Sequence, residues 1–232
     1  MRCSLGVLLL VVSGGLLPDT GAADEGGHPD PERWRETIDQ MVAAAPAAVG
    51  DDVICFIGSS SIRLWDLNRD FPDHNVVNRG FGGSVMADAT HYLDQLVFPH
   101  RPGVVVVYAG DNDIAHGLSP GQVAEDYAAF VERLRTKLPK AQVVYISIKP
   151  SLARWDRYPQ MAEANQQIRR QIESDPRATY VDICQPMLGP DDQPRPELFV
   201  ADGLHLNDRG YEVWRAAVAA ALPAAQQTGQ KN

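Results

Sequence analysis

The stretch Val104-Val105-Val106-Val107-Tyr108, followed closely by Gly110, decides the class of fold. All five residues are apolar and four are β-branched, with no polar position in alternation. A run of this kind is typical of a strand that is buried on both faces, as in a parallel sheet covered by helices. It therefore predicts a central strand of an α/β protein.

Four other short apolar runs predict further strands, at residues 52–57, 75–78, 143–148 and 180–183. Helical patterns lie between them. Ser119-Pro120-Gly121-Gln122 is a capping box before one helix, and Asn207 is expected to cap the last helix. Strands that alternate with helices form parallel βαβ units. We expect an α/β protein, a three-layer α/β/α sandwich with a flavodoxin-like, doubly wound, five-stranded parallel sheet.

The ends of the chain differ in composition from its centre. Residues 1–23 combine the positive Arg2, an apolar run at 5–17 and small residues before an acidic stretch, which is the pattern of a secretory signal peptide. A membrane anchor is the alternative, although the run is short for a spanning helix. We therefore expect a secreted or periplasmic protein with no stable membrane insertion after cleavage of the signal peptide.

The rest of the chain is expected to form one folded domain. Residues 24–50 are interpreted as a linker and an N-terminal helix, residues 51–224 as the domain itself, and residues 225–232 as a polar tail. Cys55 and Cys184 lie on strands that are not expected to be neighbours, so we predict two free, buried thiols. The net charge of −9 and the lack of a basic stripe argue against a nucleic-acid partner. Nothing in the sequence indicates an oligomeric state.

Unusual residues follow four of the five predicted strands. In a doubly wound sheet, sites form beyond the carboxyl ends of the strands. The segments concerned are Gly58-Ser59-Ser60-Ser61, Asn78-Arg79-Gly80-Phe81-Gly82-Gly83, Gly110-Asp111-Asn112-Asp113 and Asp202-Gly203-Leu204-His205. Taken singly, each also fits a structural role, as a helix cap or a turn. Together they place a serine, two candidate oxyanion donors and an Asp–His pair at one edge of the sheet, which are the parts that acyl transfer requires.

A metal or other cofactor is not predicted. Asp111, Asp113 and His116 are close in sequence, but they lack a fourth partner, and three such residues are a weak sign of a metal site. The Gly-rich segment after the second strand lacks the spacing of a dinucleotide fingerprint.

The four segments, in this order, resemble the blocks of the SGNH (GDSL-type) hydrolase superfamily. The resemblance extends from Val53 to the last helix and implies an SGNH hydrolase domain over residues 51–224. It implies Ser60 as the nucleophile, Asp202 and His205 as its partners, and an oxyanion hole formed by Ser60, Gly83 and Asn112. Ser59 stands where the name-giving motif has Asp, and Ser61 makes the choice of nucleophile less clear from residue type alone.

The expected function is that of a secreted serine esterase that cleaves a short-chain ester, such as an acetyl ester, through an acyl-enzyme on Ser60. The substrate would be a small molecule or a glycan ester. An O-acyltransferase with the same site and a catalytically inactive binding module are the alternatives. Four cationic residues also lie near the predicted site and are candidates for substrate binding, with a role as surface cations or in structural ion pairs as the alternative: Arg63, Arg79, Lys149 and Arg154.

Overall fold

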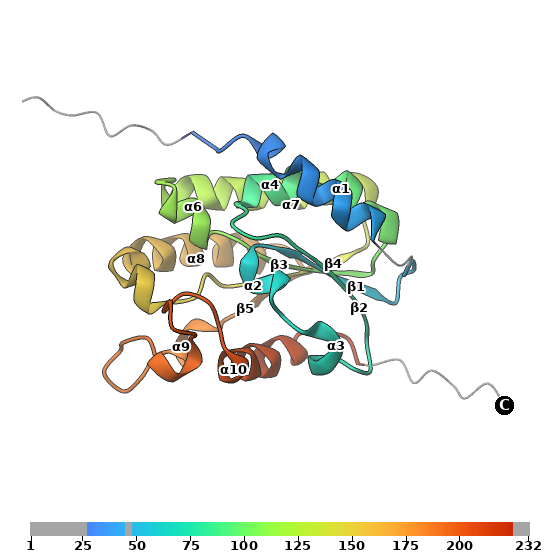
Figure 1. Cartoon of the computed structure of the whole chain (residues 1–232). Coiled ribbons are helices and arrows are strands. Elements are labelled where there is room, and N and C mark those ends of the chain that lie inside the picture. The colour runs from blue at the N-terminus through green and yellow to red at the C-terminus, as the bar shows by residue number, and fades with distance from the viewer. Residues whose placement is uncertain (1–26, 45–47, 225–232) are drawn as a thin grey trace, which may run out of the picture.

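A five-stranded parallel sheet forms the centre of the protein in the computed structural model, which describes residues 27–44 and 48–224 (Figure 1). The strand order is β2-β1-β3-β4-β5, the flavodoxin-like order expected from the sequence. All four strand pairs are parallel. The strands are β1 Val53–Gly58, β2 Asn75–Gly80, β3 Val104–Tyr108, β4 Gln142–Ile146 and β5 Ala178–Val181.

Helices cover both faces of the sheet, so the predicted three-layer sandwich is confirmed (Figure 1). One apolar core includes Cys55, Ile57 and Val105, with side chains from α1 Arg35–Ala43, α4 Met86–His91, α5 Leu93–Leu96, α6 Asp111–Ala115, α7 Pro120–Lys137 and α8 Tyr158–Glu173. The other core includes Phe56, Val106 and Tyr108, with side chains from α2 Ser60–Arg63, α3 Leu67–Asp70, α9 Cys184–Met187 and α10 Asp208–Ala219. Short 3₁₀ helices complete the fold: η1 Pro31–Trp34, η2 Phe98–His100, η3 Leu152–Arg157 and η4 Pro196–Leu198.

The last two strands end earlier than the sequence predicts, because polar side chains replace the ladder partners. Ile148 donates its N–H to Asn165 Oδ1 at 2.8 Å and accepts from Asn165 Nδ2 at 2.9 Å. Ile183 donates its N–H to Ser147 Oγ at 3.0 Å. Buried backbone groups need partners, and these side chains supply them outside the sheet. The chain is thereby released from the sheet at the edge where the site lies.

Two helical segments are interrupted. The N-terminal helix begins as η1, capped by the Asp30 carboxylate, and α1 then ends at Ala43. α4 and α5 meet at Tyr92, whose hydroxyl donates to the Pro31 carbonyl at 2.8 Å. This bond ties the N-terminal segment to the helices behind β1.

Cys55 and Cys184 are free and buried, as predicted. Burial raises the pKa of the Cys55 thiol to about 12 and that of Cys184 to about 11, so both are held as thiols at neutral pH. The predicted signal peptide and the polar tail lie outside the described residues. Within the described part of the chain, none of the helices combines the length and the apolar character that crossing a membrane requires.

Candidate active site

The candidate nucleophile is placed by a turn that only glycine can make. Gly58 has φ +134°, and a Cβ atom there would lie 1.9 Å from the Tyr108 carbonyl oxygen. The chain therefore passes against the end of β3 without a side chain in the way. The next residues turn into α2, where Ser60 is the first residue and is partly exposed, whereas Ser59 and Ser61 are buried. Solvent exposure therefore distinguishes Ser60 from its two neighbours as the candidate nucleophile, whereas residue type alone does not.

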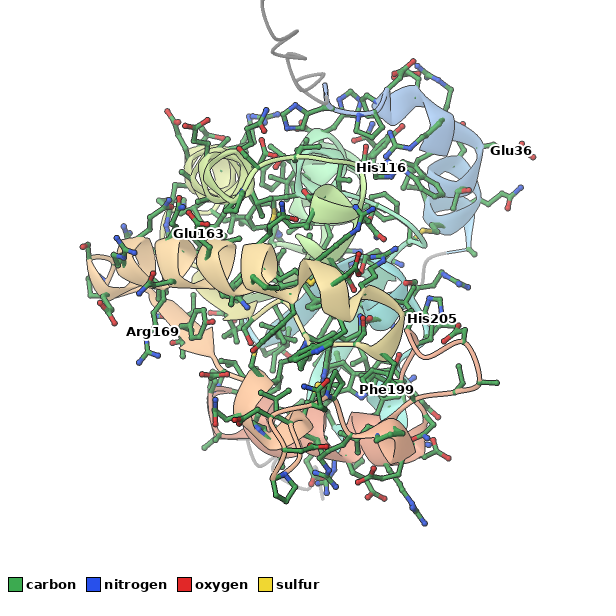
Figure 2. The ribbon with its side chains drawn as sticks, turned by 90° about the vertical axis from the view of Figure 1, so that its left-hand side faces the viewer. Glu36, His116, Glu163, Arg169, Phe199 and His205 are labelled. Atoms are coloured by element: carbon green, nitrogen blue, oxygen red, sulfur yellow. The ribbon has the colours of Figure 1, made fainter. Side chains whose placement is uncertain are left out.

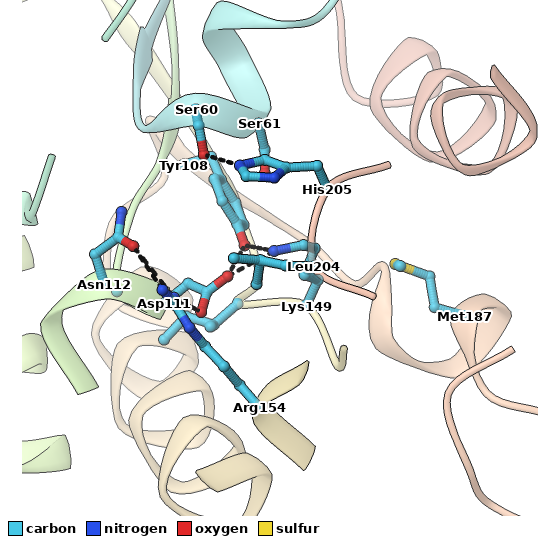
Figure 3. A network of polar contacts seen from close by, with 12 residues as sticks. Ser60, Ser61, Tyr108, Asp111, Asn112, Lys149, Arg154, Met187, Leu204 and His205 are labelled. Atoms are coloured by element: carbon cyan, nitrogen blue, oxygen red, sulfur yellow. Dashed lines mark hydrogen bonds and ion pairs between the residues drawn. The ribbon is translucent and has the colours of Figure 1, made fainter. Parts of the chain in front are cut away.

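Ser60, His205 and Asp202 form a continuous chain of hydrogen bonds. Figure 3 shows the bond between Ser60 and His205. The Ser60 Oγ atom lies 3.0 Å from His205 Nε2, and His205 Nδ1 lies 2.6 Å from Asp202 Oδ2. Asp202 Oδ1 also accepts from the backbone N–H groups of Leu204 and His205, at 2.8 and 2.9 Å. The bond from His205 and these two backbone bonds lower the pKa of Asp202 to about 2. The carboxylate thus stays ionised at neutral pH, and Ser60 is presented to a basic imidazole nitrogen.

Hydrogen bonds hold the loop that carries His205 at both ends. Figure 2 shows His205 and Phe199 of this loop on the same side of the molecule. Asn207 caps α10 through Gly210 N–H, as predicted, and its Nδ2 atom also donates to the carbonyls of Glu197 and Phe199, both at 2.9 Å. The Gly203 carbonyl accepts from Ala153 N–H at 3.0 Å. The side chains of His205 and Asp202 remain 30% and 46% exposed, so water reaches this candidate catalytic pair.

The candidate oxyanion donors Gly83 and Asn112 lie on two other loops, which a hydrogen bond joins. Gly83 has φ +75°, and neither its N–H nor that of Ser60 makes a hydrogen bond within the described residues. Asn112 donates one hydrogen of its Nδ2 atom to the Ser84 carbonyl at 3.0 Å, which leaves the second hydrogen for another acceptor. Two backbone donors and one amide donor are the groups that can hold a developing oxyanion.

Asp113 joins the two loops, a role that the sequence did not indicate. Its carboxylate accepts from the N–H of Gly110 at 2.9 Å and from the N–H of Met86 at 2.8 Å. Burial raises the pKa of this carboxyl to about 7. The carboxylate holds the loop after β3 against the start of α4, directly after the loop with Gly83.

The four cationic candidates have different surroundings. Lys149 is 1% exposed and pairs with Asp111 at 2.5 Å, so the alternative of a structural ion pair fits it, and binding a substrate does not. Arg79 is 7% exposed and donates to His100 Nε2 at 3.0 Å, so it does not fit a substrate-binding role either. Arg63 is exposed, and its guanidinium lies beside Gly82. Arg154 binds Asp111 and Asn112.

Asp111 and Asp113 have separate partners and do not converge on a common point. Among the residues described, no group of three or more His, Cys, Asp or Glu side chains is arranged to hold a metal ion.

An open groove lies beside His205, with a volume of about 520 Å³. Leu64 and Val200, both more than 40% exposed, contribute apolar surface to it. Its polar lining includes Asp66, Arg69, Asp202, Asn207 and Asp208. His205 and Asp202 both line this groove, so the groove borders the candidate site.

In this site a serine at the end of a strand is hydrogen-bonded to a histidine, and the histidine is hydrogen-bonded to an aspartate. With candidate oxyanion donors on neighbouring loops, this is the geometry of a serine-dependent acyl hydrolase. Residues 63–213 match the GDSL-like Lipase/Acylhydrolase family, and the chain belongs to this family, whose enzymes hydrolyse esters. The predicted SGNH (GDSL-type) resemblance is thereby confirmed.

Known proteins share both sequence and fold with the chain. It is 30% identical over 188 residues to the platelet-activating factor acetylhydrolase IB subunit alpha1 of Homo sapiens, over 77% of this chain and 78% of the relative. It is 25% identical over 118 residues to Esterase TesA of Pseudomonas aeruginosa, which covers 48% of this chain and 59% of that esterase. A Streptococcus pneumonia structure described as a platelet activating factor superposes with a TM-score of 0.72 at 19% identity, over 84% of this chain and 93% of that one, and shows the shared fold.

Proposed function

We propose that this protein is a secreted serine esterase that cleaves a short-chain ester through an acyl-enzyme on Ser60. The observation that carries the proposal is the pair of distances from His205, 3.0 Å to Ser60 Oγ and 2.6 Å to Asp202 Oδ2. One imidazole nitrogen is thus held by a carboxylate while the other is free to take the serine proton.

The mechanism follows from this geometry. His205 Nε2 removes the Ser60 proton while Oγ attacks the ester carbonyl carbon, and the carbonyl electrons move to the oxygen. The N–H groups of Ser60 and Gly83 and the free Asn112 N–H stabilise this oxyanion. The imidazolium then protonates the departing alcohol, which leaves an acyl group on Ser60. Water, deprotonated by His205, attacks the acyl-enzyme and releases the acid.

A short acyl group such as acetyl is the proposed substrate chemistry. The groove beside His205 is open and has a mixed polar and apolar lining, which suits a compact polar ester better than a long alkyl chain. The name of the human relative, an acetylhydrolase, supports an acetyl ester as the first substrate to test. The exposed Arg63 beside Gly82 is the proposed contact for an anionic or sugar part of the substrate.

Export is proposed from the N-terminal sequence alone. Arg2, the apolar run at 5–17 and the small residues before Asp24 support a cleaved signal peptide. Expression of the full chain in a bacterial host, followed by cell fractionation and N-terminal sequencing, tests this. A mature protein that starts near Asp24 outside the cytoplasm is expected, and a cytoplasmic protein that retains its N-terminus contradicts export.

The exposure of the catalytic pair favours hydrolysis over acyl transfer. Since the side chains of Asp202 and His205 are 46% and 30% exposed, water competes with any other acceptor for the acyl-enzyme. An inactive binding module would need no ordered triad, yet the described residues contain all three members at hydrogen-bond distance.

The deciding experiment is an ester panel with matched serine variants. p-Nitrophenyl esters of two to twelve carbons and acetylated glycans are offered to the wild type, to Ser60→Ala and to Ser61→Ala. Ser60→Ala is expected to lose at least about 10⁴-fold in kcat. Ser61→Ala, a change at the buried neighbour, is expected to retain activity. Equal losses in both variants, or turnover by Ser60→Ala, would overturn the assignment of the nucleophile. Best turnover with the twelve-carbon ester would overturn the short-chain proposal.

A further inference from the structure

Arg154 is held in a network of charges directly behind Asn112 (Figure 3). Its NH1 and NH2 atoms both donate to Asn112 Oδ1, at 3.1 and 3.2 Å. NH1 also pairs with Asp111 Oδ1, while Lys149 Nζ holds the other carboxylate oxygen at 2.5 Å. The side chains of Lys149 and Asp111 are only 2% and 5% exposed.

The network selects one orientation of the Asn112 amide. A guanidinium can only donate and a backbone carbonyl can only accept. Arg154 therefore requires the oxygen of Asn112 on its own side, and the Ser84 carbonyl requires the NH₂ group on the other. With both ends satisfied, the second Nδ2 hydrogen is left for the oxyanion. A flipped amide would present oxygen to the oxyanion and NH₂ to Arg154, and both contacts would be repulsive.

The backbone at Arg154 is shaped for this contact. Within η3, Arg154 departs from helical geometry, with φ −131° and ψ 27°. The preceding residue, Ala153, donates its N–H to Gly203 in the loop that carries His205. The same short segment thus contacts the loop of the base and the side chain of an oxyanion donor.

The charge of the network also favours the transition state. Two cations share one carboxylate, so the cluster formed by Asp111, Lys149 and Arg154 carries one excess positive charge in a largely buried place. Buried ion pairs are poor stabilisers compared with apolar packing of the same volume. A role in function explains the network better than a contribution to stability does.

We infer that Arg154 is a positioning residue of the oxyanion hole, acting through Asn112, and that Asp111 and Lys149 hold Arg154 in place for this purpose. The inference rests on the proposed function. It reassigns Arg154 from substrate binding to orientation of the amide that binds the oxyanion.

The test is a double-mutant cycle on a neutral substrate, with Arg154→Met, Asn112→Ala and the double variant. Both p-nitrophenyl acetate turnover and the rate of labelling by a fluorophosphonate are measured. Since removal of one oxyanion donor costs about 10²–10³-fold, Arg154→Met is expected to lower kcat by roughly 10–100-fold with little change in KM. In the Asn112→Ala background, the same change is expected to cost less than about threefold, because the amide it orients is gone.

Arg157→Met is the matched control. Arg157 joins the same η3 segment to α6 through the carbonyls of Ile114 and Ala115, at 3.0 and 2.8 Å, without contacting Asn112. It is expected to retain kcat within about threefold. Arg154→Lys is expected to stay impaired, because one ammonium cannot replace the planar fork that reaches Asp111 and Asn112 together. Added methylguanidine is expected to restore part of the turnover of Arg154→Ala.

Each result has a defined meaning. Equal losses from Arg154→Met in the wild-type and Asn112→Ala backgrounds overturn the inference, as does a loss confined to KM. If Arg154→Met does not fold, the test rests on the turnover of Arg154→Ala with added methylguanidine and on the turnover of Arg154→Lys. The inference is overturned if methylguanidine does not rescue Arg154→Ala while Arg154→Lys has wild-type turnover. A wild type that neither turns over the ester nor reacts with the fluorophosphonate overturns the proposed function, whereas a reactive wild type with an unaffected Arg154→Met overturns only this inference.

Discussion

Asp202→Asn is the substitution whose effect the structure defines most fully. Asp202 Oδ1 accepts from two backbone N–H groups, and Oδ2 accepts from His205 Nδ1 at 2.6 Å. An asparagine has one accepting oxygen and one donating NH₂ group in place of these two oxygens. It therefore cannot satisfy both sides at once.

The amide has two possible orientations, and each removes activity for its own reason. If its oxygen serves the backbone, the NH₂ group faces His205 Nδ1 and forces the proton onto Nε2, so the imidazole can no longer accept from Ser60. If its oxygen serves His205, the NH₂ group opposes the backbone N–H groups of Leu204 and His205, and the loop shifts. The first orientation keeps the loop intact and is expected to prevail.

The wrong imidazole tautomer in a serine protease triad lowers kcat by about 10⁴-fold. At about 1.4 kcal/mol for each factor of ten, this is an increase of about 5 kcal/mol in the activation free energy. Because the Asp202 side chain is 46% exposed, the fold is expected to tolerate the change. The assay is kcat for p-nitrophenyl acetate, with circular dichroism and the thermal midpoint as controls. A folded Asp202→Asn variant with kcat within tenfold of the wild type would refute the tautomer argument.

Three further predictions concern pH and the loops around the site. The hydrogen bond from His205 and two backbone hydrogen bonds lower the pKa of Asp202 to about 2. Because this folded-state pKa lies below the ordinary value near 3.8, the contribution of Asp202 to stability is expected above that pH and is lost as the pH falls through about 2, which acid denaturation monitors. Asp113→Asn is expected to lower the free energy of unfolding by about 1–3 kcal/mol and kcat by roughly tenfold, because an amide leaves one of two buried N–H groups without an acceptor. An unchanged urea midpoint together with an unchanged kcat would be inconsistent with this prediction. Asn207→Ala is expected to lower the free energy of unfolding, measured by urea denaturation, by about 1–2 kcal/mol, because a helix cap and two hydrogen bonds to the preceding loop are lost together. A decrease of less than about 0.5 kcal/mol would count against this prediction.

The strands were predictable where apolar side chains alone set their limits. Residues 104–108 form β3 as predicted, since a run buried on both faces has no other stable place in a small domain. The ends of β4 and β5 were not predictable, because Asn165 and Ser147 take over the backbone partners of Ile148 and Ile183. Those side chains are remote in sequence from the residues that they bind, and no local pattern reports such a contact.

The candidate site divides in the same way. The strand-end positions of Ser60, Gly83, Asn112 and His205 follow from the order of strands and turns. The surroundings of the cationic side chains do not follow from the sequence, because the sequence does not reveal which carboxylate each of them contacts. Lys149 and Arg154 were equally good candidates for substrate contacts until Asp111 was found between them.

The sequence by itself determined the α/β class, the doubly wound order and the family, since these depend on apolar periodicity and on motifs that are local in the chain. Only the tertiary structure decided which of three serines faces the histidine, which cations are buried and how the Asn112 amide is turned. These properties arise from contacts between residues up to 145 positions apart, as between Ser60 and His205. A contact of that kind exists only once the sheet has brought its strand ends together.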